Sequence, residues 1–197
     1  MLTHTNHVRS GHSWTLALLA ALSFGFASPA PAADDDTSTY DRDSVIKDAT
    51  EFFGEMTEGL AKVIEKAFNE QGRPNGYIKG EEIAGAIGVG LRYGDGTLTL
   101  KQGGSAKVYW QGPSIGFDLG ANASKVFILV YNLPKTQDIY QRFPGIDGSL
   151  YYVAGAGINY QQRNDIVLAP IRLGVGLRTG ASVGYMHYTP TKTLNPL

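Results

Sequence analysis

Residues 86–100, AIGVGLRYGDGTLTL, contain the pattern that decides the fold. Successive side chains of a strand point to opposite faces, so this strand carries large apolar side chains on one face and is bare at Gly88 and Gly90 on the other. The string GVGLR at 88–92 returns as GVGLR at 174–178. A strand that is bare on one face can curve sharply or let a second backbone approach closely. The two copies therefore predict strands of a small, strongly curved sheet.

The chain around these strands has the spacing of turn residues that is typical of an all-β protein. Residues 72–184 hold 21 of the 25 glycines, and short alternating runs are separated there by turn residues. Turn signals at roughly 8–12-residue spacing indicate a sandwich or a barrel. The run VFILVY at 126–131 does not alternate, so both of its faces should be buried. We predict a mainly β fold, a small closed or nearly closed antiparallel β-barrel of about 8–10 strands, interrupted by a short helix at 135–143.

One longer helix is expected before the barrel. Apolar residues recur every three or four positions over residues 44–71, which is typical of an amphipathic helix. Gly54 and Gly59 lie within it, and each weakens a helix by about 1 kcal/mol relative to alanine. The helix therefore needs tertiary packing, or breaks in two. We expect it to cover the outer side of the strand at 126–131, which makes it one domain with the barrel at 72–197.

The N-terminus has the pattern of a secretory signal peptide at residues 1–32. The apolar run at 16–26 is shorter than the about 20 residues that a membrane-spanning helix needs, and small residues precede a cleavage site after Ala32. Residues 33–43 are then expected to be a disordered acidic linker. The sequence thus predicts an exported protein of the periplasm. The alternative is a leader that stays uncleaved as a membrane anchor.

Composition excludes several classes of function. The chain has 197 residues, 43% of them hydrophobic, a formal net charge of −1 and no cysteine. The absence of a basic excess argues against a nucleic-acid partner. The absence of cysteine removes thiol nucleophiles, disulfides and cysteine-ligated metals, and export without cysteine fits a bacterial periplasm.

No convincing set of catalytic residues is present. The string GPSIG at 112–116 matches the G-x-S-x-G elbow of serine hydrolases, and His187 follows it in the chain. However, apolar and small residues continue to alternate after Ser114 as in a strand, whereas the elbow needs a turn and a helix. No phosphate-binding loop or dinucleotide fingerprint occurs. We therefore predict no enzyme activity, no metal and no cofactor, with a hydrolase that uses Ser114 as a remote alternative.

Binding is better supported than catalysis. Aromatic side chains with polar tips can line an apolar pocket, and arginines can bind phosphate or carboxylate groups bidentately. The alternatives are that the aromatic residues fill the barrel core and that the arginines are solvated on an outer face. The candidate ligand-binding residues are Tyr93, Tyr109, Trp110, Tyr152, Arg92, Arg172 and Arg178.

Several longer strings of the chain are specific enough to compare with known families. They are GRPNGYI at 72–78, GLRYGDGTL at 90–98, KVYWQGPS at 107–114, KVFILVYNL at 125–133, IYQRF at 139–143, VLAPIR at 167–172 and NP at 195–196. These strings resemble the EipA family of envelope-integrity proteins. The resemblance covers about residues 72–197 and implies an exported periplasmic protein of alphaproteobacterial type. It also implies a small soluble β-barrel, a role in keeping the envelope intact under stress and no established enzyme activity.

A more distant resemblance is to SYLF lipid-binding domains, through Trp110, Pro113 and Ser114, the pair Leu119-Gly120 and the strand at 127–132. It implies a lipid or amphiphile as ligand. Together these observations predict a non-catalytic periplasmic barrel that supports envelope integrity by binding a lipid-like or apolar ligand, with envelope proteins as further partners. The alternative is an integral outer-membrane barrel, whose strands would show a continuous lipid-facing apolar band.

Overall fold

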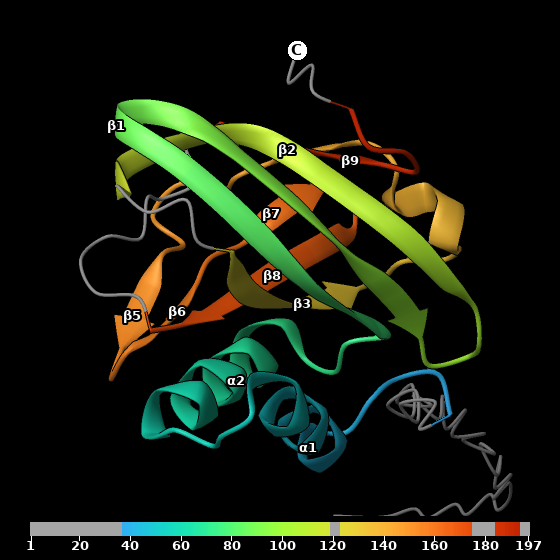
Figure 1. The fold of residues 1–197 in the computed structure, drawn as a ribbon. Helices are drawn as coiled ribbons and strands as arrows, with labels where there is room; N and C mark the ends of the chain where they lie inside the picture. The colour runs from blue at the N-terminus through green and yellow to red at the C-terminus, as the bar shows by residue number, and fades with distance from the viewer. Residues whose placement is uncertain (1–36, 119–122, 175–183, 194–197) are drawn as a thin grey trace, which may run out of the picture. The chain divides into compact units, whose positions relative to one another are not determined.

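The computed structural model describes residues 37–118, 123–174 and 184–193, all of which belong to one compact unit, Asp34–Leu197. Two helices come first and strands make up most of the rest (Figure 1). None of the helices in these ranges is long and apolar enough to cross a bilayer. The elements are α1 (Arg42–Phe53), α2 (Glu58–Gln71), β1 (Gly76–Leu100), β2 (Ser105–Asp118), β3 (Ser124–Tyr131), the 3-10 helix η1 (Thr136–Ile139), β4 (Arg142–Pro144), β5 (Tyr151–Val153), β6 (Ala156–Ile158), β7 (Gln161–Arg163), β8 (Ile166–Leu173) and β9 (Tyr185–Thr189).

The expected single helix is two helices, because its middle is interrupted. Asp41 caps α1 by accepting a hydrogen bond from the Ser44 backbone N–H at 2.9 Å. Gly54 ends α1 with φ +94°, a left-handed conformation that favours glycine. Thr57 then starts α2 by accepting from the Leu60 backbone N–H at 3.0 Å. Gly54, which was expected to weaken a single helix, is therefore the position at which the first of two helices ends.

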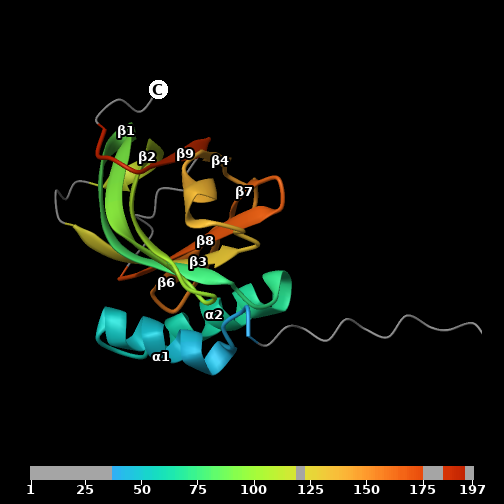
Figure 2. The same cartoon turned by 90° about the vertical axis from the view of Figure 1, so that its right-hand side faces the viewer.

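The strands form one curled antiparallel sheet, as predicted. Nine strands of the described chain join in the order β4-β9-β2-β1-β3-β8-β6-β5, and β7 also pairs with β8. An isolated bridge between Gly145, which follows β4, and Gln161 in β7 links the two ends of the curl. The sheet is therefore a nearly closed barrel, and Figure 2 shows its curvature above the two helices.

Strand β1 is the element that makes the curl. Its first part pairs with β3 and its second part with β2, so the 25-residue strand bends back over itself. The two parts are in close contact at Gly80 and Gly96, where a Cβ on either residue would collide with the backbone of the other part. Glycine is needed here because the two backbones are in contact.

Both faces of β3 are buried, as its sequence predicts, but against different partners. One face packs on α1 and α2, and the other points into the barrel. The same division holds for β8. The outer core contains Val45, Ala49, Leu60, Val63, Ile64, Ala67, Phe127, Leu129, Tyr131, Ala156, Ile158, Tyr160, Val167, Ala169 and Ile171. The interior core contains Ile78, Leu98, Val108, Trp110, Val126, Ile128, Val130, Leu133, Ile139, Phe143, Ile166, Leu168, Met186 and Tyr188.

The helix expected at 135–143 is wrong in type and extent. Only the four residues of η1 are helical, and the chain then enters β4. Phe143 is fully buried in the interior core and pairs with Met186 of β9. Pairing with β9 and burial of this ring therefore override the local signal for a helix.

Candidate ligand-binding site

A buried ion cluster lies inside the barrel and joins parts of the chain that are distant in sequence. Glu82 comes from the first part of β1, Arg92 from the second part and Arg172 from β8. These residues are 5%, 4% and 7% exposed. Glu82 is four positions after the buried Ile78, and Arg172 is four positions after the buried Leu168, so strand alternation points both charged groups inward.

Hydrogen bonds organise the cluster around the Glu82 carboxylate. Arg172 binds it through two nitrogens, with Nε on Oε1 and Nη2 on Oε2 at 3.1 Å, the bidentate geometry that gives strong, oriented pairs. Arg92 Nη1 lies 3.4 Å from Oε1, and Trp110 Nε1 donates to Oε2 at 3.4 Å. Arg172 Nη1 also donates to Asn159 Oδ1 at 3.0 Å.

The electrostatics keep this carboxylate ionised. Burial by itself raises the pKa of Glu82, but Arg172 and Arg92 outweigh it and lower the pKa from 4.5 to about 2. At neutral pH the three buried side chains therefore carry one negative and two positive charges.

A separate hydrogen bond lies beside this network, where the Tyr188 ring is near Trp110 with ring centroids 6.0 Å apart. The Tyr188 hydroxyl donates to Gln161 Oε1 at 3.0 Å. Burial raises the pKa of Tyr188, so its hydroxyl stays protonated as a donor. Gln161 Nε2 is buried and has no hydrogen-bond partner among the described residues. We call the following residues the interior cluster: Glu82, Arg92, Trp110, Asn159, Gln161, Arg172 and Tyr188.

Trp110 is positioned by the bare face of β1. It pairs with Gly94 in the β1–β2 register, and a Cβ at Gly94 would fall within the indole ring. A Cβ at Gly80 would also meet this ring, at 2.7 Å. The glycines therefore leave the space that lets the large ring lie flat beside the strand, next to Glu82.

A cavity of about 130 Å³ adjoins the same tryptophan. Tyr93 and Tyr109 line it, and Asp95, whose carboxylate is paired with Lys107, lies at its edge. A water molecule takes about 30 Å³ of liquid, so the space suits a small head group or a short piece of chain. The remaining lining residues are Glu81, Ile83, Gly94, Gln111, Ala123, Lys192 and Thr193.

A larger groove of about 410 Å³ lies elsewhere, between α2 and the segment at 146–151. Its wall is ordered by the Tyr160 hydroxyl, which donates to Glu70 at 2.7 Å. Tyr152 is 45% exposed on β5 and lines neither space. It is therefore not part of the site around Trp110.

Five of the seven predicted residues lie in two neighbouring places, one on each face of the β1–β2 pair. Arg92, Arg172 and Trp110 belong to the interior cluster, and Tyr93 and Tyr109 line the adjoining cavity; Arg178 falls outside the described residues. The alternative that the arginines are solvated on an outer face is wrong for Arg92 and Arg172, which are buried.

Glu82, at the centre of the cluster, was missed by the sequence analysis. Its signal was available, because Glu82 has the same strand parity as the apolar Ile78, whereas Lys79 and Glu81 have the other parity. A carboxylate on the apolar face of a strand needs a buried cationic partner.

The arrangement required of a serine hydrolase is not formed at Ser114. The chain continues in β2 as far as Asp118 instead of turning into a helix, and the register sets His187 opposite Gln111. Burial and the nearby Arg142 lower the pKa of His187. Within the residues described, no group of three or more histidine, cysteine or acidic side chains could hold a metal ion.

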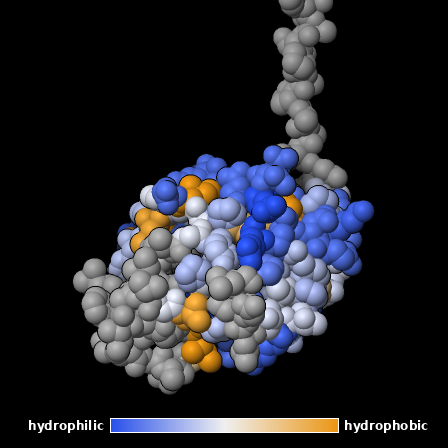
Figure 3. Space-filling model, turned by 90° about the horizontal axis from the view of Figure 1, so that it is seen from above, coloured by the Kyte–Doolittle hydropathy of each residue, from blue (hydrophilic) through white to orange (hydrophobic). Residues whose placement is uncertain are grey.

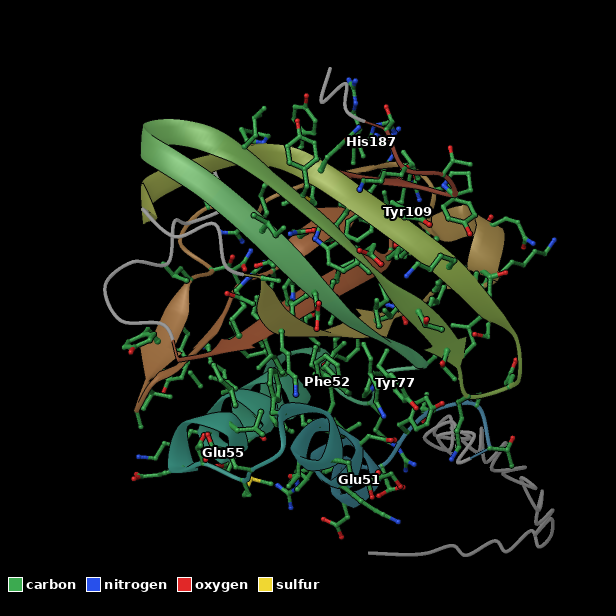
Figure 4. The ribbon with its side chains drawn as sticks, viewed as in Figure 1. Glu51, Phe52, Glu55, Tyr77, Tyr109 and His187 are labelled. Carbon is green, nitrogen blue, oxygen red and sulfur yellow. The ribbon has the colours of Figure 1, made fainter. Side chains whose placement is uncertain are left out.

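The labelled side chains of Figure 4 separate the two sides of the molecule. Phe52 and Tyr77 lie between the helices and the sheet, where Tyr77 stacks on Phe127 with ring centroids 5.3 Å apart. Tyr109 and His187 lie on the side of the barrel away from the helices. The cavity beside Tyr109 is therefore remote from the helix layer.

Comparisons with known proteins agree on the fold and the family. Residues 38–197 match the family described as Envelope integrity protein A. A crystal structure of a beta-barrel-like, uncharacterized protein from Brucella abortus is 47% identical, with a TM-score of 0.74, and the match covers 81% of this chain and 99% of that one. Among curated proteins, none matches the sequence.

Proposed function

Because this chain belongs to the Envelope integrity protein A family, we propose that it is a non-catalytic protein of the periplasm that supports the cell envelope by holding the head of a lipid-like molecule. The family and the barrel-like relative support an envelope-related role. The predicted leader at residues 1–32 supports export, and the strand geometry at Ser114 supports a function without catalysis.

One observation carries the binding proposal. Trp110 belongs to the buried cluster that holds Arg92 and Arg172, and it also borders the cavity that Tyr93 and Tyr109 line on the other face of β1 and β2. Ligand sites combine apolar or aromatic walls with a few fixed polar groups. A polar head next to an apolar chain has the complementary chemistry, so an amphiphile suits this site better than a wholly apolar molecule.

The surface supports this proposal over a membrane-embedded barrel. The outward side chains of β3 and β8 pack on α1 and α2 instead of being available to lipid. On the face shown in Figure 3, the coloured residues are mainly hydrophilic, and the apolar ones form small separate groups. A membrane barrel presents a continuous apolar band.

Native mass spectrometry of protein extracted without detergent tests the proposal. We expect the protein in the periplasmic fraction, with a lipid-sized adduct that organic extraction releases. Tyr109→Ala should reduce the adduct several-fold, since the phenol ring lines the cavity. Tyr152→Ala is the matched control, because Tyr152 is exposed outside the cavity, and it should leave the adduct unchanged. Recovery of only bare protein, with no affinity for any added envelope lipid, would refute lipid binding.

A further inference from the structure

We propose that the groove between α2 and the segment at 146–151 binds an uncharged saccharide. This groove shares no lining residue with the interior cluster or with the cavity beside Tyr109. A ligand here is therefore additional to the lipid-like molecule proposed above, and either can be bound without the other.

The size and the shape of the groove suit a small organic ligand. Its volume is about 410 Å³, against about 130 Å³ for the cavity beside Tyr109. Ligand pockets usually measure about 300–1,000 Å³. Asp147 and Leu150 on the loop side are exposed, whereas Tyr160 is only 4% exposed. A bound molecule therefore has one side against the protein and the other side toward water.

Hydrogen bonds hold the loop wall of the groove in place. The Ser149 hydroxyl donates to the Ile146 carbonyl oxygen at 2.6 Å and accepts from the Tyr160 backbone N–H at 3.0 Å. The Ile146 backbone N–H in turn donates to the Tyr160 carbonyl oxygen at 2.9 Å. Because the loop is tied to the buried Tyr160, this wall is formed before a ligand arrives, which lowers the entropic cost of binding.

The helix wall of the groove is ordered as well. Glu70 on α2 accepts hydrogen bonds from Lys66 Nζ and from the Tyr160 hydroxyl. These two bonds lower the pKa of Glu70, so its carboxylate is ionised at neutral pH. Lys66 Nζ also lies 4.8 Å from the centre of the Tyr151 ring. The groove thus presents a fixed carboxylate beside a fixed aromatic ring.

The lining combines apolar and hydrogen-bonding groups. Ile146, Leu150 and the ring of Tyr151 are apolar, while Gln71 and Asp147 add an amide and a second carboxylate. A sugar ring has the matching character, because one face carries C–H groups and its edge carries hydroxyls that donate to carboxylate and amide oxygens. An acyl chain would lie beside the carboxylates and keep its outer side in water, which is less favourable.

The charge of the lining disfavours an acidic ligand. Within the described lining, Lys66 is paired with Glu70, which leaves the carboxylate of Asp147 without a compensating cation. The groove therefore has one negative charge in excess and repels phosphate and uronic acid groups. Hydroxyl groups instead form charge-assisted hydrogen bonds to carboxylates. This charge is the reason for choosing an uncharged saccharide.

Two-dimensional ¹H–¹⁵N NMR of the labelled protein tests the proposal. The probes are N,N′-diacetylchitobiose, digalacturonic acid and hexanol. We expect the uncharged disaccharide to shift amide signals of residues 66–71 and 146–151, and to leave those of Tyr93 and Tyr109 in place. The acidic disaccharide should bind at least about tenfold more weakly, because the groove has an excess negative charge. Hexanol should leave the groove signals in place.

Substitutions at exposed positions separate binding from folding. Leu150→Ser should weaken binding of the uncharged disaccharide several-fold by removing apolar contact. Leu91→Ser is the matched control, because Leu91 is 40% exposed outside the groove and Leu150 is 46% exposed within it, and it should leave binding unchanged. Asp147→Asn keeps an oxygen that accepts hydrogen bonds but removes the charge, so it should narrow the difference in affinity between the two disaccharides.

Each contrary outcome overturns a stated part of the proposal. Unshifted groove signals with both disaccharides, or shifts confined to the cavity beside Tyr109, would overturn the site. Binding of hexanol in the groove without binding of either disaccharide would show an apolar groove and overturn the saccharide. An unchanged affinity in Leu150→Ser would place the ligand elsewhere. None of these results bears on the lipid-sized adduct of the proposed function, because Tyr109 does not line the groove.

Discussion

The two faces of strand β3 differ in what they are packed against. The face toward the helices is apolar throughout, with Phe127 stacked on Tyr77 and close to Phe52. The inner face of β3 is also apolar, but it faces the barrel interior, which contains Glu82 and Arg172. The ionic groups therefore lie inside the barrel, while the core between the outer face of β3 and the two helices is apolar.

This difference indicates a division of labour. A helix layer supplies a second hydrophobic core, so the barrel interior does not have to be wholly apolar for the sheet to be stable. Buried ion pairs contribute little net stability but are costly to break. We expect the outer core to determine stability mainly through packing and the interior cluster to do so through charge.

The largest expected effect comes from breaking the interior pair. Arg172→Met removes both hydrogen bonds that orient Glu82 and leaves a buried carboxylate with Arg92 as its cation. We expect a loss of about 3–5 kcal/mol in the free energy of unfolding, measured by urea denaturation. A loss under about 1 kcal/mol would mean that water reaches the carboxylate, contrary to its burial.

In the outer core, a substitution that leaves a cavity should lower the free energy of unfolding. Leu60 on α2 is fully buried against the sheet, and Leu60→Ala should cost about 2–5 kcal/mol. The same urea experiment measures it. Since no charge is involved, this loss should be the same at pH 7 and at pH 3. A pH-dependent loss would show that the two cores are not independent.

Acid should weaken the interior specifically. Because the pKa of Glu82 is about 2 in the folded protein and 4.5 ordinarily, its contribution is fully present above about pH 4.5 and is lost as the pH falls toward 2. The lost amount is about 3 kcal/mol. Glu82→Gln carries no titrating group at this position, so the difference in stability between the two proteins should shrink over that pH range. Parallel pH curves would contradict the charged, buried state of Glu82.

The smallest effect tests how the helix layer is attached. Thr57 caps α2 through the Leu60 backbone N–H, and Thr57→Ala should lower the free energy of unfolding by about 1 kcal/mol. The lipid-sized adduct expected in native mass spectrometry should not change. If this substitution reduced the adduct, the helix layer would contribute to ligand binding as well as to stability.

Local pattern alone predicted much of this molecule. Three patterns led to the correct kind of element: the alternation at 86–100, the unbroken apolar run at 126–131 and the amphipathic period at 44–71. They did so because the order of apolar and polar side chains reflects whether one face or both faces of an element are buried. The family strings agreed with the barrel and added the envelope role. The short helix at 135–143 failed because pairing with β9 outweighs local preference.

Only part of the candidate site could be predicted from the sequence. Arg92, Arg172 and Trp110 were singled out for their chemistry, and the structure brings them together. Glu82 was not, since its partner Arg172 is 90 residues away along the chain. Strand parity places Glu82 on the apolar face, but nothing local identifies the distant cation that pairs with it.

The order of side chains by itself determined the strands, the helix layer and the bare face of β1, because each follows from short-range alternation and from the missing side chain of glycine. Tertiary structure alone decided that β1 bends back on itself at Gly80 and Gly96, and that charges from β1 and β8 meet inside the barrel. The reason is physical: the energy of an ion pair depends on distance and on exclusion of water, and both are set only when remote segments pack.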